Sequence, residues 1–338
     1  MIHACAATEA KSSLWPFTYE PAPLGEQDVD VAITHCGICH SDLHLLDNDW
    51  RITTFPFVPG HEIVGRITAI GAGVKHLELG QRVGIGWQCG ACHECEFCGA
   101  GLENLCRRQR ATCVGRHGGF ADRVIVDSRF AFALPETLDS AEAAPLLCAG
   151  ITVHAPLARH LPEKGRRVGV VGIGGLGHLA LQFARALGHQ VTAISSNPKK
   201  EAEAKSLGAH HFAVIDEKRS VNKFKGSFDL LLVSAIGTLD WQLLLELLAP
   251  RGKLCLVGVP DGALTIPPFL LIESQKSICG SNIGSPNELR TMLAFAAEHK
   301  IRSRIELFPL NEVNEAIRRL RSNSLRYRAV LQMAPVAG

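Results

Sequence analysis

The sequence predicts an α/β protein of two domains, one rich in β-strands and one built from alternating strands and helices. The chain has 338 residues, whereas one ordinary domain holds about 150. Up to about residue 150, short β-type runs alternate with glycine turns such as Gly71-Ala72-Gly73. Past Ile151 strands alternate with helical periodicity, which is typical of βαβ units around a parallel sheet.

Composition narrows the choice of partner. Apolar residues make up 46% of the chain, and 35 Lys and Arg stand against 33 Asp and Glu. A formal net charge of +2 gives no electrostatic argument for binding nucleic acid or an anionic membrane. No apolar run approaches the ~18 residues that span a bilayer. We expect a small-molecule partner, with no nucleic acid and no membrane.

Cysteine usage indicates the compartment. There are twelve cysteines in a long chain that opens Met1-Ile2-His3 without a basic and apolar signal sequence. Disulfide frameworks belong to short secreted chains, so we expect a reducing cytoplasm.

The predicted elements follow the two patterns in chain order. The β-type runs of the first part include Val29–Thr34, Ile63–Ile70, Arg82–Ile85 and Ala121–Val126. The second part has strands at Val168–Val171, Val191–Ser195, Asp229–Ser234 and Lys253–Val259, and helices at His178–Leu187, Pro198–Leu207 and Leu239–Leu248. The tail has helices at Pro286–His299 and Glu312–Arg321 and a strand at Tyr327–Gln332.

The stretch Cys36–His44 concentrates thiols, imidazoles, a hydroxyl and a carboxylate within nine residues. Zinc prefers sulfur and imidazole ligands, and a catalytic zinc keeps one position open. The stretch therefore indicates a metal site with a proton path beside it. A redox pair, or two buried cysteines that only fill space, remains the alternative for Cys36 and Cys39.

A glycine-rich loop carries four cysteines with the spacing C-x2-C-x2-C-x7-C, namely Cys92, Cys95, Cys98 and Cys106. Four thiolates at such spacing close a tetrahedral shell around zinc and leave no position for substrate. Cys89 precedes this four-cysteine loop by three residues, so spacing alone leaves one cysteine in surplus. A zinc ribbon for partner binding is the rival interpretation.

His61 lies in the segment Pro59–Gly65 and is followed by Glu62, but Gly65 and the turn-to-strand setting do not fit the helical H-E-x-x-H metalloprotease motif. Cys39 upstream and Cys148 far downstream could complete a Cys2His shell with an open position. Taken singly, Cys148 is more typical of a buried core cysteine.

A glycine loop follows the strand ending at Val171 and opens the next helix: Gly172, Ile173, Gly174, Gly175, Leu176 and Gly177. Its glycines allow a tight turn and let backbone N–H groups approach a pyrophosphate. This strand–loop–helix context predicts a dinucleotide site.

The following strand ends Ser195-Ser196-Asn197, where NAD-binding domains usually carry an acidic residue, and none appears before Glu201. Lys199 and Lys200 fall in the first turn of the next helix, where the helix dipole disfavours cations. A bound 2′-phosphate would resolve that conflict, so we predict NADP(H). A solvated charged turn is the alternative.

Together these segments resemble the zinc-dependent medium-chain alcohol dehydrogenases, over essentially the whole chain. The string Ser195–Lys200 and the ending Tyr327-Arg328 resemble the cinnamyl alcohol dehydrogenase branch, most of all its bacterial broad-range NADPH-dependent aldehyde reductases. The resemblance implies a GroES-like catalytic domain (1–149 and 285–338), a Rossmann NADP-binding domain (150–284) and a homodimer. The implied reaction is hydride transfer between NADP(H) and an aldehyde/primary alcohol pair.

The resemblance also implies roles for individual residues. Cys39, His61 and Cys148 would bind the catalytic zinc, Glu62 could reach it when substrate is absent, and Cys36 and Cys89 would bind none. The four-cysteine loop would bind a structural zinc. Asp42 would orient His61, and Ser41 would relay a proton through the cofactor ribose towards His44. The implied cofactor contacts are His40, Thr152, Gly172, Gly174, Gly175, Leu176, Gly177, Ser195, Ser196, Asn197, Lys200, Val259, Asn282 and Arg328.

The substrate pocket departs from that of the plant enzymes. They carry a tryptophan shortly after the structural zinc loop, whereas residues 107–119 contain no aromatic residue here, and Asn282 replaces a bulky apolar residue. We expect Trp50 and Trp87 to narrow the pocket instead. A polyol or secondary alcohol dehydrogenase is the alternative activity. A non-catalytic zinc-binding interaction protein would leave Cys39, Ser41 and the glycine loop unexplained.

Overall fold

The computed structural model describes residues 1–334, which form two compact units. One unit comprises Met1–Cys148, Gly284–Ala297 and the chain from Arg302 onward; the other comprises Ala149–Ile283 and Glu298–Ile301. The boundaries that we predict, at 149/150 and 284/285, lie one residue away from these. Within the predicted 285–338 segment, Glu298–Ile301 falls in the second unit instead, and the last four residues lie outside the described residues. Each unit is described by itself below.

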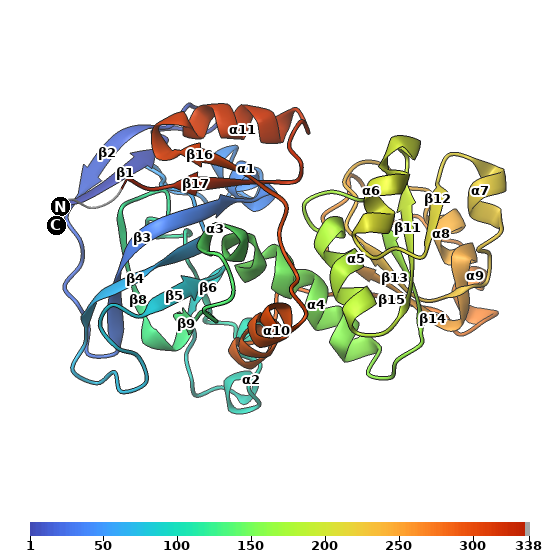
Figure 1. Ribbon diagram of the computed structural model, residues 1–338, viewed down its shortest axis with the longest axis horizontal. Helices are drawn as coiled ribbons and strands as arrows, with labels where there is room; N and C mark the ends of the chain where they lie inside the picture. Colours follow the sequence, from blue (N-terminus) through green and yellow to red (C-terminus); the bar gives the residue numbers. More distant parts are fainter. Residues whose placement is uncertain (335–338) are drawn as a thin grey trace. The chain divides into compact units, whose positions relative to one another are not determined.

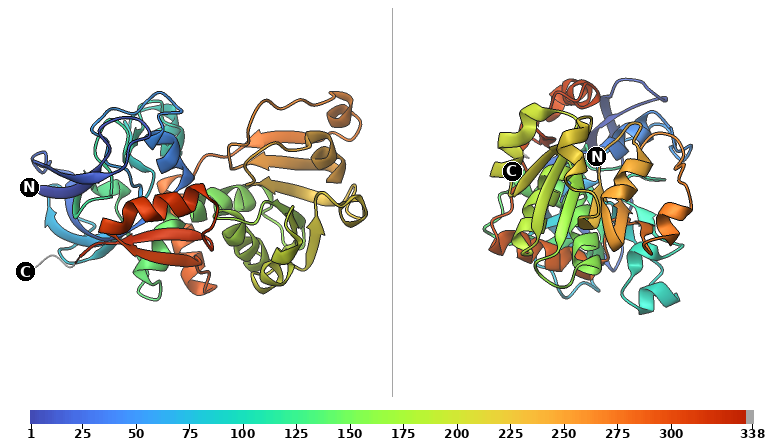
Figure 2. Two further views of the ribbon diagram at one scale, coloured as in Figure 1. Left: turned by 90° about the horizontal axis from the view of Figure 1, so that it is seen from above. Right: turned by 90° about the vertical axis from the view of Figure 1, so that its right-hand side faces the viewer.

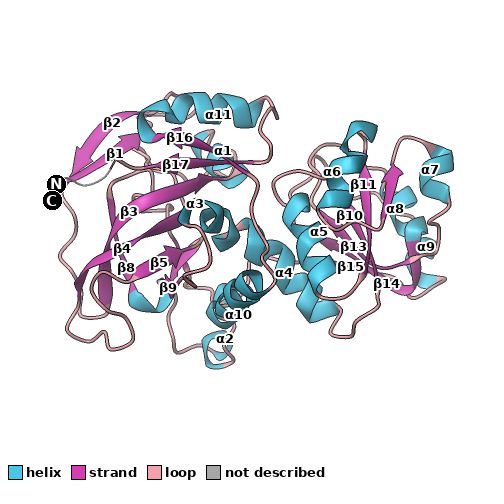
Figure 3. Ribbon diagram, viewed as in Figure 1, coloured by secondary structure: helices cyan, strands magenta, loops and turns pink. Residues whose placement is uncertain are grey.

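The first unit is organised by one large sheet, so that strands dominate it in Figure 3. Its order is β16-β17-β3-β4-β5-β9, with β8 also paired to β3. The bounds are β16 Ile305–Pro309, β17 Arg328–Gln332, β3 Asp28–Ile38, β4 Glu62–Ile70, β5 Arg82–Ile85, β9 Phe132–Ala133 and β8 Arg123–Asp127. Two hairpin-like pairs accompany it, β1 Ile2–Ala6 with β2 Trp15–Tyr19, and β6 Gln88–Gly90 with β7 Arg110–Ala111. This is the expected GroES-like β domain.

The sheet forms because apolar residues recur at every second position. Val29, Val31 and Ile33 alternate along β3 and are at most 2% exposed, which is the period of a strand with one face in the core. The C-terminal tail completes the sheet, because β17 pairs antiparallel with β3. Figure 1 shows α11 (Val313–Arg321) lying along β16 and β17. Val313, Ala316, Ile317 and Leu320 form its buried stripe.

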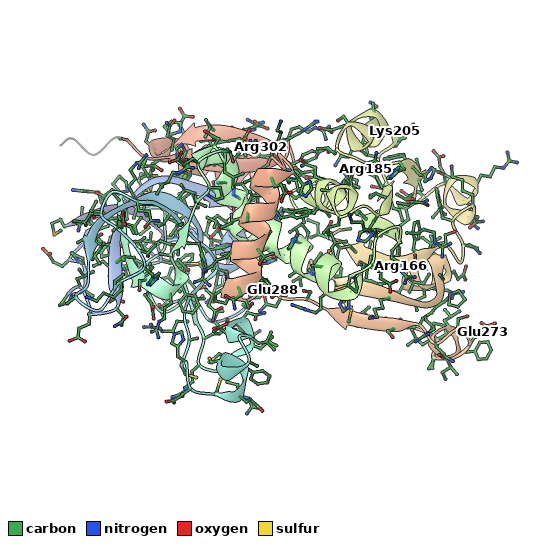
Figure 4. All side chains as sticks on the ribbon, turned by 60° about the horizontal axis from the view of Figure 1, so that its bottom comes forward. Arg166, Arg185, Lys205, Glu273, Glu288 and Arg302 are labelled. Atoms are coloured by element: carbon green, nitrogen blue, oxygen red, sulfur yellow. The ribbon has the colours of Figure 1, made fainter. Side chains whose placement is uncertain are left out.

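Short helices connect the strands of this unit. They are α1 His40–Leu46, α2 Glu96–Gly99, α3 Ser140–Ala143, α10 Pro286–Glu298 and the 3₁₀ turns Glu103–Leu105, Ser128–Phe130, Ala144–Leu147 and Leu310–Glu312. The start of α10 is capped reciprocally, because the Ser285 N–H donates to Glu288 Oε2 (2.7 Å) and the Glu288 N–H donates to Ser285 Oγ (3.3 Å). Figure 4 shows Glu288 and Arg302 at opposite ends of α10. Arg302 pairs with Glu142 of α3 at 3.2 Å.

The second unit is a six-stranded parallel sheet with the order β12-β11-β10-β13-β14-β15. Counted along the unit, this is the order 3-2-1-4-5-6 of a doubly wound Rossmann fold. The strands are β10 Arg167–Val171, β11 Gln190–Ser195, β12 His211–Val214, β13 Phe228–Val233, β14 Leu248–Leu256 and β15 Ser277–Gly280. They lie side by side in the right-hand view of Figure 2.

Helices cover both faces of this parallel sheet. They are α4 Ala149–His160, α5 Gly177–Ala186, the 3₁₀ turn Pro198–Lys200, α6 Glu201–Ser206, α7 Lys218–Asn222, α8 Trp241–Leu247 and α9 Phe269–Ile272. Helix α5 packs against β10, β11 and α4, whereas α8 packs against β14 and α9. Because both faces are covered, central strands such as Leu230–Val233 are continuously apolar and fully buried.

Two expectations need correction, and several elements, among them α4, were not predicted. The predicted helix Pro198–Leu207 divides at Glu201 into a 3₁₀ turn and α6. The predicted strand Lys253–Val259 begins earlier and ends at Leu256, so Val259 lies beyond it and is 64% exposed. Helix α4 was not predicted, because it contains Pro156 and the β-branched run Ile151–Val153, which is unfavourable in isolated helices.

Among residues 1–334, no single helix is long and apolar enough to cross a membrane, although Ser140–Leu147 and Ala149–His160, joined by a bend, together meet the length and composition required.

Candidate active site and metal centres

Four metal-ligating side chains converge in the first unit. Cys39 precedes α1, Glu62 opens β4 directly after His61, and Cys148 follows the turn Ala144–Leu147. One ligand atom from each side chain lies within 4.8 Å of the others; we call this set the catalytic cluster: Cys39, His61, Glu62 and Cys148. Residues more than a hundred positions apart thus present two thiols, one imidazole and one carboxylate to a single point.

The Asp42 carboxylate fixes two of these ligands. Its Oδ2 accepts the backbone N–H of Cys39 at 2.8 Å, and its Oδ1 accepts from the Gly60 N–H and from His61 Nδ1, both at 3.0 Å. Asp42 is only 2% exposed. Because Nδ1 of His61 is engaged, Nε2 is the ring nitrogen left to bind a metal.

The polar atoms in the cluster fit a metal ion. His61 Nε2 and Glu62 Oε2 are buried and have no hydrogen-bond partner in the part of the chain that the structure describes. Leaving such atoms unpaired is costly. A hydrogen bond from the Cys148 thiol lowers the pKa of Cys39 well below its usual value, which favours the thiolate, the form that binds zinc. Two sulfurs, one nitrogen and an exchangeable carboxylate match a zinc site with an open position.

Glu62 is held by a cation from the C-terminal tail. Its Oε1 accepts from the guanidinium of Arg328, and both side chains are buried. Burial raises the pKa of Glu62 to about 7, although Arg328 opposes that rise. Gly37 lies against this carboxylate, since a Cβ there would come within 2.0 Å of Glu62 Oε2. Glycine at position 37 therefore allows Glu62 to face the cluster.

A hydroxyl and an imidazole lie beside the cluster on α1. Ser41 Oγ is 3.8 Å from Cys39 Sγ, and His44 is three residues further along the helix. Residues three apart on a helix share one face. His44 Nδ1 is 2.9 Å from Asp49 Oδ2, so its ring is anchored at one nitrogen.

Two tryptophans stand around the same point. The Trp87 ring meets His61 edge-on with centroids 4.9 Å apart, and Trp50 stacks on His44 at 5.2 Å. The two indoles contact each other edge-to-face at 6.2 Å. They form a half-buried aromatic wall beside the cluster.

The four-cysteine loop forms a second, separate set in the same unit. Cys92 Sγ lies 3.8 Å from Cys98 Sγ and 3.4 Å from Cys106 Sγ, and all four sulfurs lie within 4.8 Å of one another. Tetrahedral zinc with Zn–S bonds of about 2.3 Å requires S–S distances of about 3.8 Å. The sulfur atoms therefore fit a closed zinc site.

Cys89 and Cys36 belong to neither of these two groups of ligands. Cys89 is buried and accepts from the Arg116 guanidinium at 3.3 Å. Cys36 is completely buried in β3, and burial raises its pKa well above the usual value. It therefore stays a neutral, inert thiol.

In the second unit the glycine loop joins β10 to α5 at the point where the strand order reverses. A Cβ at Gly177 would meet the carbonyl oxygen of Gly172 at 1.9 Å, so close packing of loop and helix requires glycine. At Gly174 no described atom would lie within 4 Å of a Cβ. The space above Gly174 is thus left for a ligand, as a pyrophosphate cradle requires.

The end of β11 lies next to this loop. Lys200 Nζ donates to the carbonyl of Ile173 within the loop at 2.5 Å. Asn197 caps the following turn by accepting from the Lys199 N–H at 3.0 Å, and the Asn197 N–H donates to Ser195 Oγ at 3.1 Å. Ser196 and Lys199 are exposed. The end of β11 therefore carries neutral Ser196 and, just beyond it, the cations Lys199 and Lys200 in place of an acidic residue.

Comparison with known proteins places the chain in a family. Residues 25–136 match the family model for the alcohol dehydrogenase GroES-like domain, and residues 175–298 match the model for zinc-binding dehydrogenases. An aldehyde reductase of Synechocystis sp. is 43% identical over 98% of both chains. The chain belongs to the zinc-dependent alcohol dehydrogenases.

Other relatives place this alcohol dehydrogenase in the cinnamyl alcohol dehydrogenase branch. A cinnamyl alcohol dehydrogenase structure from Sorghum bicolor has a TM-score of 0.94 and 38% identity, covering 98% of this chain and 97% of that one. One from Helicobacter pylori complexed with NADP(H) has a TM-score of 0.91 and 31% identity, with the same coverage. A mannitol dehydrogenase of Petroselinum crispum is 41% identical over 95% of this chain and 98% of its own.

The remaining predicted cofactor residues of this alcohol dehydrogenase lie in different settings. His40 is half-buried at the start of α1, and Arg328 is buried against Glu62. Thr152 is buried in α4, whereas Val259 and Asn282 are exposed. Their contacts with the cofactor stay predictions.

Two features of the site escaped sequence reasoning. Arg328 was expected only as a cofactor contact, and the pairing of β17 with β3 reveals its contact with Glu62. Cys113 lies within 4.8 Å of both His61 and Asp42 and is buried. No spacing pattern points to Cys113, because it approaches His61 only through the fold.

Replacement of Asp42 by Asn tests whether this carboxylate orients Cys39 and His61 for metal binding. Asn retains the size but offers one acceptor in place of two, so Cys39 or His61 loses its support. We expect affinity for the catalytic zinc to fall about 10–100-fold, as for other residues that orient metal ligands. Competition with a chromophoric chelator measures this affinity.

The Asp30→Asn variant is the matched control, because Asp30 is a buried acid of the same unit that pairs with Arg123 instead. Its catalytic zinc should be held as in the parent. Equal zinc affinity in Asp42→Asn and the parent enzyme would contradict the assignment.

Replacement of Cys106 by Ser tests the four-cysteine loop. We expect loss of about one zinc per chain by elemental analysis, together with a lower thermal midpoint, because a structural zinc supplies folding free energy directly. Cys89→Ser is the control and should retain both ions. The assignment is wrong if Cys89→Ser loses zinc and Cys106→Ser does not.

Proposed function

We propose that this alcohol dehydrogenase reduces a broad range of aldehydes to primary alcohols with NADPH. One observation carries the proposal: His61 Nε2 is buried among two thiols and a carboxylate, with no hydrogen-bond partner among residues 1–334. Such an arrangement favours a metal with an open position, on which a carbonyl oxygen can bind.

The chemistry follows from the residues around that point. Zinc bound there would supply a Lewis acid for the aldehyde oxygen as hydride arrives from the nicotinamide. Asp42 keeps His61 in the tautomer that leaves Nε2 available. Ser41 Oγ gives its proton to the alkoxide oxygen, and a proton from solvent returns to Ser41 by way of His44. Trp50 and Trp87 exclude water from the reacting carbonyl.

NADP(H) is favoured over NAD(H) by the charge at the end of β11. Ser196 replaces the usual acidic residue, which would repel a 2′-phosphate, and Lys200 lies against the glycine loop. The Helicobacter pylori relative was solved with NADP(H). Further contacts with the cofactor are assigned to five residues: His40, Thr152, Val259, Asn282 and Arg328.

The aromatic wall indicates the substrate class. Trp50 and Trp87 offer flat apolar surfaces, which suit aromatic and aliphatic aldehydes. A polyol needs hydrogen-bond partners for each hydroxyl, and indole offers only one donor. A mannitol dehydrogenase activity, as in the name of the Petroselinum relative, is therefore the less favoured alternative.

The proposal extends to assembly and compartment. β15 stands at the end of the sheet order, and the preceding segment exposes Leu264, Phe269 and Ile272. An unpaired edge strand beside apolar side chains favours pairing with a second copy, so we propose a homodimer. Thiolate ligands must remain reduced, so we propose a cytoplasmic location.

Replacement of Lys200 by Ala tests the cofactor assignment. Loss of a cation near the 2′-phosphate should raise the KM for NADPH about tenfold or more, corresponding to roughly 1.4 kcal/mol, while the KM for NADH changes little. Steady-state rates of aldehyde-dependent NAD(P)H oxidation give both constants.

Lys205→Ala, in the same helical region but paired with Glu201, is the matched control. A parent enzyme whose kcat/KM is higher with NADH than with NADPH would refute the cofactor proposal.

A substrate panel tests the reaction itself. We expect kcat/KM to be highest for aromatic and medium-chain aldehydes and at least tenfold lower for sugar aldehydes, because the aromatic wall pairs poorly with hydroxyl groups. Trp50→Ala should narrow that difference by removing apolar surface. Higher kcat/KM for mannitol oxidation than for any aldehyde reduction would favour the polyol alternative.

A further inference from the structure

A third group of metal-ligating side chains lies in the second unit, apart from both sites described above. Cys255 of β14 and Cys279 of β15 are direct partners in the parallel ladder, so their side chains share one face of the sheet. His160 ends α4 and brings its Nε2 to 3.6 Å from Cys279 Sγ. One ligand atom from each lies within 4.8 Å of the other two. We call these three residues the edge cluster.

The geometry of the edge cluster matches a metal ligand set. Tetrahedral zinc with bonds of about 2.3 Å to sulfur and about 2.0 Å to nitrogen sets an S–N distance of about 3.5 Å. The Cys279 Sγ–His160 Nε2 distance of 3.6 Å is close to that value. The two thiols and one imidazole of the edge cluster also match the donors of the catalytic cluster apart from the Glu62 carboxylate.

Burial agrees with a built site. Cys255 is 0% exposed, whereas Cys279 and His160 are half-buried, so the cluster is partly exposed to solvent. The three residues come from three different elements. An ion bound there would tie the edge strand β15 to its neighbour β14 and to α4.

Nearby charge limits the strength of binding. The positive charges of Lys253 and Arg159 act on Cys279 and would repel a metal cation. Two thiolates, formed when the thiols release their protons, would offset that repulsion. Binding therefore transfers two protons to solvent, and the two thiolates neutralise the divalent charge. With only three protein ligands and two adjacent cations, this site should hold metal less tightly than the four-cysteine loop.

We propose that Cys255, Cys279 and His160 bind a third metal ion, Zn²⁺ or a similar divalent ion, which exchanges with the solution. A water or another small ligand would occupy the fourth position. The proposal does not depend on the proposed aldehyde reductase activity.

The alternative for these residues is a disulfide between Cys255 and Cys279, formed with a peroxide as oxidant. In that step the two thiols lose two electrons and two protons, and the peroxide becomes water. A disulfide would leave His160 without a role, although its ring nitrogen lies at ligand distance. The metal therefore accounts for all three side chains.

The test counts metal ions on the reduced holoenzyme. Protein equilibrated with excess Zn²⁺ and passed through a desalting column should carry about three zinc ions per chain, and about two after dialysis against a weak chelator. The third ion should raise the thermal midpoint of the parent. Co²⁺ added to the two-zinc enzyme should give sulfur-to-cobalt charge-transfer absorption.

Cys279→Ser and His160→Asn should each weaken the third site at least tenfold and abolish the zinc-dependent rise in thermal midpoint. Their two tightly bound zinc ions and their NADPH oxidation rate should be unchanged, which separates this result from any failure of the proposed activity. His211→Asn, at an exposed position of the same unit, is the matched control and should retain the third ion.

Two outcomes would overturn the proposal. The parent enzyme could hold only two zinc ions at any zinc concentration, or His160→Asn could bind the third ion as tightly as the parent. A Cys255–Cys279 disulfide found by mass spectrometry after mild peroxide, in a parent that takes up only two ions, would assign the pair to redox chemistry instead. Cys255 is fully buried, and its replacement could disturb folding. The substitutions are therefore made at the half-buried Cys279 and His160.

Discussion

The carboxylate of Asp42 is the constraint on which the catalytic cluster depends. It accepts from the backbone before α1, from the turn at Gly60 and from the His61 ring, so one buried group sets the relative positions of two ligands from separate elements. Hydrogen bonds to a charged group contribute about 1.5–3 kcal/mol each. The pairing of β3 with β4 already brings the end of one strand beside the start of the other, with Gly37 opposite Glu62. Asp42 then positions Cys39 and His61, which flank that pair.

The same unit uses its C-terminal tail to complete the site. β17 enters the sheet beside β3 and brings Arg328 against Glu62. An isolated buried charge costs several kcal/mol, and the two partners relieve each other. The second carboxylate oxygen of Glu62 has no hydrogen-bond partner in the described part of the chain, and Gly37 leaves room for it. Sheet pairing thus determines which carboxylate oxygen faces the catalytic cluster.

Burial and neighbouring side chains determine which cysteines can bind a metal. Cys36 is sealed inside β3 and Cys89 is taken up by Arg116, so neither is available to zinc. The four-cysteine loop has the sulfur geometry of a closed zinc site, and a zinc bound there would hold the loop. The edge cluster lies between these extremes, because two of its three members are half-buried and its neighbours are cationic. If the proposed sites bind metal, the edge cluster should therefore bind it less tightly than the four-cysteine loop.

Sequence by itself determined the fold class, the four-cysteine loop and the glycine loop, because each depends on local spacing: alternating apolar residues, short C-x2-C steps, and glycines between a buried strand and a helix. Joining Cys39, His61 and Cys148 into one cluster from the sequence required family resemblance, because no local pattern spans a hundred residues. Only the tertiary structure decided the Arg328–Glu62 pair, the approach of Cys113 to His61 and the edge cluster. These contacts arise from strand pairing and helix packing between distant segments, which local periodicity does not encode.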